Sequence, residues 1–160
     1  MDKNIILHGE KVDLVSSTIE LWHEFYSGYV IDPIMDDNPY TYDFERIEEA
    51  YYLRICDSSR LYFSIMKDRK VIGQIYLKHM DMDKMESDFG ISLINDSVKG
   101  KGYGTEAIKL LIDYSANVQG FKSIIADSVH RNIRSQHVLE KLGFIYTRED
   151  EVFKYYRLEL

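Results

Sequence analysis

Cysteine and proline are scarce in this chain of 160 residues, which has one cysteine and two prolines. The single cysteine, Cys56, excludes both an internal disulfide and a cysteine-based metal cluster. No apolar run is long enough to span a bilayer, and the first residues, MDKNIILHGEK, lack the apolar core of a signal peptide. We therefore expect a soluble cytoplasmic protein that does not bind membranes.

An excess of basic residues is also missing. The chain has 20 Lys and Arg against 27 Asp and Glu, which gives a formal net charge of −7. Nucleic-acid binding depends on a basic face that displaces counterions, so this balance argues against it. Metal binding is not expected either, because His130 and His137 have no third ligand nearby in the sequence and no His-Glu-x-x-His motif is present.

Hydrophobic residues make up 45% of the chain, enough for one domain that covers residues 1–160. Apolar periodicity and turn residues predict an α/β fold. Strands are expected over 5–15, in a hairpin over 60–80, and over 87–94, 122–129, 144–148 and 152–160. Helices are expected after Ser16, Ser17 or Thr18, and over 44–56, 105–117 and 132–142. An acidic loop over 32–43, which contains both prolines, separates the first two helices.

The stretch KGKGYGTEA, residues 99–107, places glycines and lysines directly before an apolar helix. Its glycines alternate, which excludes both the Walker loop and the dinucleotide fingerprint. Glycine lets backbone amides approach a ligand, and a helix N-terminus favours an anion. The loop therefore predicts a phosphate site. A solvated turn that only caps the helix is the alternative.

This loop follows the strand FGISLI and precedes NIRSQHVLEKLGF, and together they resemble the acyl-CoA motifs of the GNAT N-acetyltransferases, in particular the RimJ/RimL-like branch. Lys99 departs from the Arg or Gln of the family loop. The second motif is matched by Asn132, Ser135, Glu140, Lys141, Gly143 and Phe144. The resemblance implies the GNAT fold, a mixed, mostly antiparallel sheet of about six to seven strands, splayed in the middle and flanked by about four helices.

The resemblance also implies which residues hold acetyl-CoA as cosubstrate. Its pantetheine arm would pair with the backbone of Ser92, Leu93 and Ile94. Its diphosphate would lie on the loop formed by Lys99, Gly100, Lys101, Gly102, Tyr103, Gly104 and Thr105. Asn132 either reaches the pantetheine amide or caps its own helix, since asparagine is a favoured N-cap.

Two residues are the candidates for catalysis. Many family members have a tyrosine where this chain has Leu139, and the resemblance assigns Ser135 instead as the acid that protonates the thiolate. The alternative is that Ser135 is only a small residue facing the cofactor. The base is predicted to be Asp88, followed by Glu86 and His79, although acids at the start of a strand are also commonly solvated.

The sequence thus predicts an acetyl-CoA-dependent N-acetyltransferase in which a primary amine attacks the thioester directly within a ternary complex. The acceptor is a protein N-terminus, a polyamine, an aminoglycoside or another small amine, and the acids of residues 32–43 favour a cationic one. The alternative is a non-catalytic acyl-CoA-binding module, motivated by Leu139 and Lys99. A nucleotide-binding kinase is disfavoured by the loop spacing. We expect a monomer or a homodimer.

Overall fold

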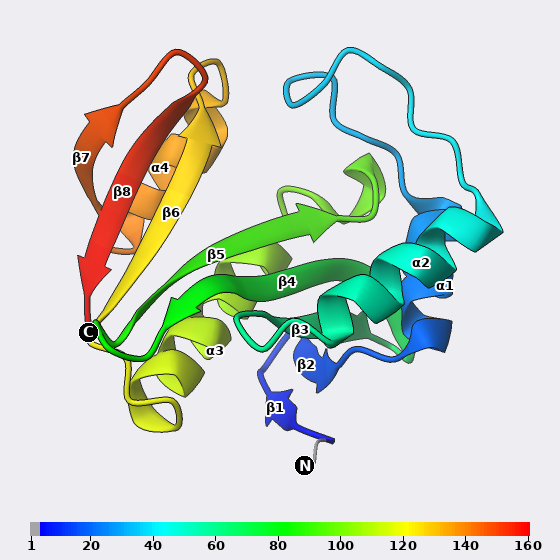
Figure 1. Cartoon of the computed structure of the whole chain (residues 1–160). Helices are drawn as coiled ribbons and strands as arrows, with labels where there is room; N and C mark the ends of the chain where they lie inside the picture. The colour runs from blue at the N-terminus through cyan, green and yellow to red at the C-terminus, as the bar shows by residue number, and fades with distance from the viewer. Residues whose placement is uncertain (1–3) are drawn as a thin grey trace.

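The computed structural model describes residues 4–160 as one open, mixed sheet with helices on both faces (Figure 1). The strands are β1 (Ile6–His8), β2 (Asp13–Ser16), β3 (Leu61–Lys67), β4 (Lys70–Asp81), β5 (Glu86–Leu93), β6 (Ser123–Val129), β7 (Ile145–Glu149) and β8 (Phe153–Glu159). The helices are α1 (Ile19–Gly28), α2 (Phe44–Ile55), the short 3-10 helix η1 (Asp96–Val98), α3 (Tyr103–Asn117) and α4 (Ile133–Lys141).

The sheet has the order β1-β2-β3-β4-β5-β6-β8-β7, and every neighbouring pair is antiparallel except β5 and β6. These two parallel strands stay paired only as far as Phe89 and Ala126. Beyond that pair they diverge, as Figure 1 shows. The predicted sheet that splays in its middle is therefore confirmed.

Strand alternation divides the core between the two faces of the sheet. Phe63 and Ile65 of β3, like Ile75 and Leu77 of β4, are fully buried in the core that contains residues of α3 and α4. Tyr62 of β3 and Tyr76 of β4 point to the opposite face, where they belong to a smaller aromatic cluster with residues of α1 and α2. The sheet is thus covered by α3 and α4 on one face and by α1 and α2 on the other.

The N-terminal segment differs from the single strand predicted over 5–15. It forms two strands, β1 and β2, joined by a turn in which the Gly9 amide donates to the Val12 carbonyl at 3.0 Å. The polar run His8 to Lys11 interrupts the apolar alternation and provides this turn. This turn raises the strand number to eight, above the predicted six to seven.

Side-chain caps begin three of the helices where the sequence predicts them. Thr18, Asp43 and Asn132 each accept a hydrogen bond from a backbone amide in the first turn of α1, α2 and α4. Helix α3 begins at Tyr103, two residues before the predicted start. Within residues 4–160, no helix has the length and apolar character that crossing a membrane requires.

Candidate active site

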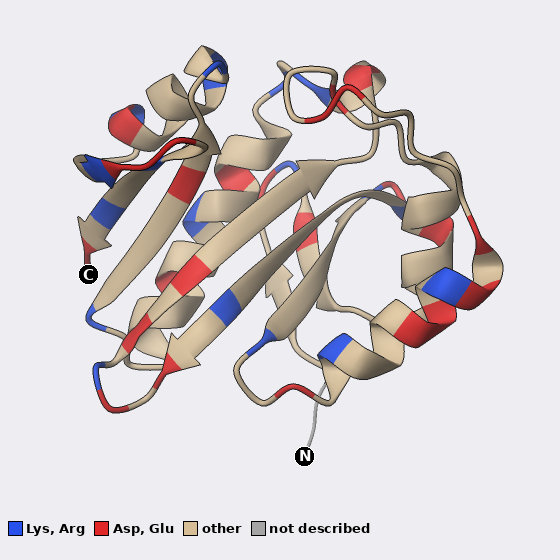
Figure 2. Ribbon diagram, turned by 45° about the horizontal axis from the view of Figure 1, so that its top comes forward, with Lys and Arg blue, Asp and Glu red and all other residues tan. Residues whose placement is uncertain are grey.

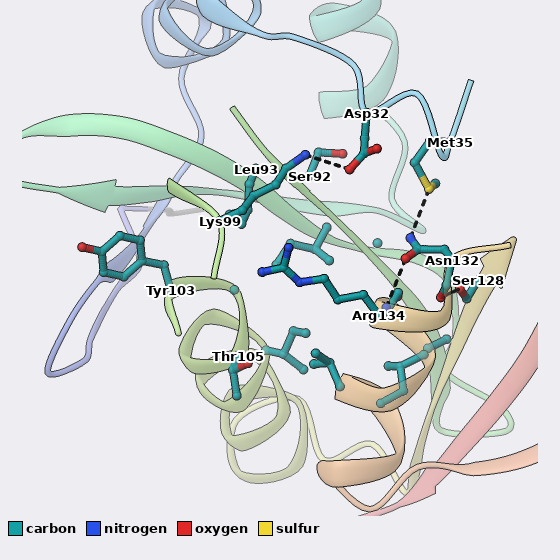
Figure 3. Close-up of a pocket in the computed structure, with 18 of the residues that line it drawn as sticks. Asp32, Met35, Ser92, Leu93, Lys99, Tyr103, Thr105, Ser128, Asn132 and Arg134 are labelled. Atoms are coloured by element: carbon teal, nitrogen blue, oxygen red, sulfur yellow. Dashed lines mark hydrogen bonds and ion pairs between the residues drawn. The ribbon is translucent and has the colours of Figure 1, made fainter. Parts of the chain in front are cut away.

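The separation of β5 from β6 opens a cleft of about 550 Å³ that crosses the sheet. Its walls come from both strands, from the N-terminal ends of α3 and α4, and from the loop that follows α1 (Figure 3). Predicted site residues that line it are Ser92, Leu93, Lys99, Gly100, Gly102, Tyr103, Gly104, Thr105, Asn132 and Ser135. The fold therefore brings most of the predicted site together in one cleft.

Helix α3 enters this cleft without a side-chain cap. Gly102 is its N-cap residue and has φ +85°, a left-handed conformation that only glycine adopts readily. The first backbone amides of a helix have no partner within the helix. In α1, α2 and α4 a side chain satisfies one of them, whereas none does so at α3 within the described residues. An anion in the cleft is the natural partner for these amides and for the positive end of the helix.

Two basic side chains that the sequence did not identify lie beside this loop. The Arg134 guanidinium comes within 3.0 Å of the position that a Cβ on Gly100 would occupy. Figure 3 shows Arg134 reaching from α4 across the cleft towards α3. The Lys11 ammonium lies 2.7 Å from the corresponding position on Gly102. Glycine at these two positions therefore lets cationic groups approach the loop closely.

Lys99 faces acidic neighbours instead. Its ammonium lies 2.9 Å from Asp32 and 3.0 Å from Asp96. Burial lowers the pKa of Lys99, but the hydrogen bonds to the two carboxylates outweigh it and the net shift is upward. The bond from Lys99 likewise holds the pKa of Asp32 below its ordinary value. The charge of Lys99 is thus partly neutralised, and its contact with a phosphate stays a prediction. Lys101 lies outside the cleft lining.

The edge of β5 that faces the cleft has no strand partner beyond Phe89, so the backbone at Ser92 and Leu93 borders the opening. Ile94 does not line it. The Ile94 amide donates to the Ile72 carbonyl at 2.8 Å, and the Ile94 carbonyl accepts from the Val30 amide at 2.9 Å. The expected backbone pairing of a ligand therefore does not extend to the Ile94 amide, because that group already anchors the end of β5.

At the other wall, Asn132 adopts the capping alternative. Its Oδ1 accepts a hydrogen bond from the Ser135 amide at 3.1 Å, and its Nδ2 donates to the Met35 sulfur at 3.4 Å. Ser135 and Leu139 both line the cleft, with Leu139 buried. The arrangement places a hydroxyl in the cleft and an apolar side chain one turn further along α4.

The three predicted base candidates lie outside the cleft lining. Asp88 and His79 are within 3.0 Å of each other, and Glu86 is 3.1 Å from Arg157. All three are in or next to the paired part of β5, before the strands diverge. The carboxylate of the sheet that does line the cleft is Asp127 of β6, which the sequence analysis did not identify.

Residues 4–160 contain no cluster of His, Cys, Asp or Glu that could hold a metal ion.

The acidic loop between α1 and α2 reaches the opening of the cleft, and Figure 2 marks the acidic residues along it. Asp32 and Asp36 line the cleft. The Arg131 side chain donates to the carbonyls of Pro33 and Ile34, so the loop is attached to the segment between β6 and α4. Two segments that are far apart in the sequence therefore meet beside the cleft.

Comparison with known proteins places these features in a family. The profile described as acetyltransferase (GNAT) domain matches residues 21–145. The probable N-acetyltransferase YjcK of Bacillus subtilis is 31% identical over 114 residues, which cover 69% of this chain and 63% of YjcK. The human alpha/beta-tubulin-N-acetyltransferase 9 is 23% identical over 180 residues, which cover 100% of this chain and 84% of that protein. The chain thus spans less than two thirds of YjcK.

Solved structures show the same fold. The spermidine N-acetyltransferase from Vibrio cholerae, in complex with CoA and spermine, superposes with a TM-score of 0.81 at 20% identity, over 94% of this chain and 96% of that one. Spermidine N(1)-acetyltransferase of Escherichia coli K12 is 28% identical in sequence over 101 residues, which cover 63% of this chain and 54% of that protein. The profile match covers well over half of the chain, and the chain therefore belongs to the GNAT acetyltransferase family.

Proposed function

We propose that this protein is an N-acetyltransferase that uses acetyl-CoA as cosubstrate and a primary amine as acceptor. The observation that carries the proposal is the uncapped N-terminus of α3, which faces a cleft between two diverging strands. The amides of such a terminus suit a diphosphate, and the free edge of β5 suits an extended amide-containing arm. Acetyl-CoA contains both groups, and the solved relative from Vibrio cholerae is described with CoA bound.

The residues present fit this cosubstrate. The diphosphate would be held by the loop amides from Gly100 to Thr105, with Arg134 beside Gly100 as the nearest guanidinium. Arginine binds phosphate through two parallel hydrogen bonds, so Arg134 compensates for a lysine at position 99. Ser92 and Leu93 would pair with the pantetheine arm through their backbone.

When bound, acetyl-CoA supplies the acetyl group as a thioester. An amide on β5 would stabilise the negative charge that develops on the carbonyl oxygen during attack. The Ser135 hydroxyl, which lies in the cleft, would give a proton to the departing sulfur. Asp88, the base predicted from the sequence, lies outside the cleft lining, and its role stays a prediction that the Asp88→Asn variant tests.

The acceptor is proposed to be a cationic amine. Asp32 and Asp36, both in the acidic loop, line the cleft, and carboxylates at this position attract a cationic amine. Relatives described as spermidine N-acetyltransferases make polyamines the first acceptors to test. On its two motifs we assign the chain to the RimJ/RimL-like branch, and we expect a monomer or a homodimer.

The test is thiol release from acetyl-CoA with a panel of polyamines, peptides and aminoglycosides, read together with the mass of the acceptor. We expect amine-dependent release and the addition of one acetyl group to the acceptor. Substitution of Asp36 and Asp37 by Asn together should raise the KM of a cationic acceptor and spare the KM of acetyl-CoA. Binding of acetyl-CoA without turnover across the panel would instead favour a non-catalytic acyl-CoA-binding module, which Leu139 at the family's tyrosine position motivates.

A further inference from the structure

Asp127 is the acidic side chain at the point where β5 and β6 separate. The last paired residues are Phe89 and Ala126, so Gly90 and Asp127 are the first residues on each side of the opening. Phe89 and Ala126 both point into the core with α3. Because side chains alternate along a strand, Asp127 points to the opposite face of the sheet, the one that carries α1 and α2. A cosubstrate held by α3 and an acceptor that enters from that opposite face would meet at this level.

Gly90 keeps the space in front of Asp127 open. It is the residue of β5 nearest the separation, and it has no side chain to project into the cleft. A Cβ at this position would come within 2.5 Å of the Tyr76 ring, so the ring packs directly over the glycine. Burial raises the pKa of Tyr76, which keeps this phenol neutral. The part of the wall that Tyr76 forms is therefore aromatic and uncharged.

Lys78 holds the Asp127 carboxylate in place through an ion pair. Its ammonium donates to Asp127 Oδ2 at 3.2 Å, and both side chains are largely shielded from solvent, with 20% and 26% of their surface exposed. Lys78 belongs to β4 and reaches Asp127 on β6 across the intervening strand. Among residues 4–160, no other hydrogen bond engages this carboxylate, so Oδ1 is free to accept one.

We infer that Asp127 is a catalytic residue that receives the acceptor amine at the opening of the sheet, and that Lys78 is the residue that positions it. This inference rests on the proposed function. As the new bond forms between the amine nitrogen and the acetyl carbon, the carbon–sulfur bond breaks. The nitrogen loses one proton, which Asp127 Oδ1 accepts. The sulfur leaves with its electron pair and takes up one proton, either directly from solvent or from Ser135. Ser135 then regains a proton from solvent and Asp127 releases its proton to solvent, so charge and atoms balance.

The inference is tested with Asp127→Asn, which keeps the size of the side chain and a hydrogen bond from Lys78 while removing the basic oxygen. General-base catalysis contributes typically about 10²–10⁴-fold, so we expect kcat to fall within that range. Calorimetry should give an unchanged Kd for acetyl-CoA. Asp113→Asn, at an exposed position of α3, is the matched control and should retain the wild-type kcat.

Lys78→Met should lower kcat less than Asp127→Asn does, with little change in the KM of acetyl-CoA, and Lys78→Arg should restore most of the rate. A merely structural role of Lys78 would change the melting temperature and both KM values together. Retention of the wild-type kcat by Asp127→Asn would overturn the inference and leave the proposed function standing. A loss of kcat in Asp88→Asn, but not in Asp127→Asn, would assign the base to Asp88. Absence of turnover by the wild-type protein would overturn both.

Discussion

At the scale of single residues, Ser135 and Leu139 decide how the leaving thiolate obtains its proton. Both side chains line the cleft, but only the serine has an exchangeable proton. Ser135 is held at the first turn of α4 because its amide donates to the Asn132 cap at 3.1 Å. The backbone that carries the hydroxyl is therefore fixed by the cap.

Replacing Ser135 by Ala should lower kcat by about 10²-fold or more, since a positioned proton donor contributes roughly that factor. The Kd for acetyl-CoA should not change, because the diphosphate and pantetheine contacts are elsewhere in the cleft. Steady-state kinetics and calorimetry measure the two quantities. Ser27→Ala, on the exposed end of α1, serves as the control. An unchanged kcat would show that Ser135 is only a small residue beside the cosubstrate.

Single residues also show where prediction from the sequence ends. Gly102 and Asn132 were predictable because their roles depend on local backbone: one begins α3 with a left-handed conformation and the other caps α4. Asp127 and Arg134 were not predictable from the sequence. Their importance depends on β5, β6 and α3 meeting in space, and a strand residue or a helix residue gives no local signal of that kind.

At the scale of elements, one carboxylate ties the N-terminal hairpin to α3. Glu106 Oε2 accepts hydrogen bonds from the amides of Lys11 and Val12, both at 2.7 Å. The apolar periodicity of α3 places Glu106 on the polar face of the helix, where a solvated side chain is expected, so its contact with the hairpin was not predictable. The division of residues 5–15 into two strands was not evident from apolar alternation either. The order of the other strands and helices was predictable because each one has its own periodicity and turn residues.

Substitution of Glu106 by Ala should therefore destabilise the fold. Hydrogen bonds to a charged acceptor contribute about 1.5–3 kcal/mol each, and solvent access to the turn reduces that value, so we expect a loss of about 1–3 kcal/mol in the free energy of unfolding. Urea denaturation followed by circular dichroism measures it. The control is Asp113→Ala on the same helix. Equal losses in the two variants would mean that removal of a negative charge from α3, rather than loss of the hydrogen bonds to the hairpin, accounts for the effect.

At the scale of the whole molecule, the chain has a net charge of −7, and local hydrogen-bond donors stabilise four of its carboxylates. The pKa values of Asp32, Asp57, Asp81 and Asp150 all lie below the ordinary value. Asp150 has the largest shift. The Phe153 amide first, then the Val152 amide and the Tyr155 hydroxyl, donate to it and lower its pKa to about 2.

These shifts make the fold sensitive to acid in a defined direction. A carboxyl whose pKa is lower in the folded chain stabilises the fold above its unfolded pKa, which is 3.8 for Asp, and loses that contribution as the pH falls through its folded pKa. The melting temperature should therefore fall as the pH is lowered from about 4 to about 2, because the unfolded chain binds more protons. Asp150→Asn tests the contribution of the turn between β7 and β8, since its amide cannot ionise. The variant should have a lower melting temperature than the wild type near neutral pH, and the difference between the two melting temperatures should shrink towards pH 2. Circular dichroism across the pH series measures both temperatures. A difference in melting temperature that stays constant over the whole pH series would mean that the ionisation of Asp150 does not stabilise the fold.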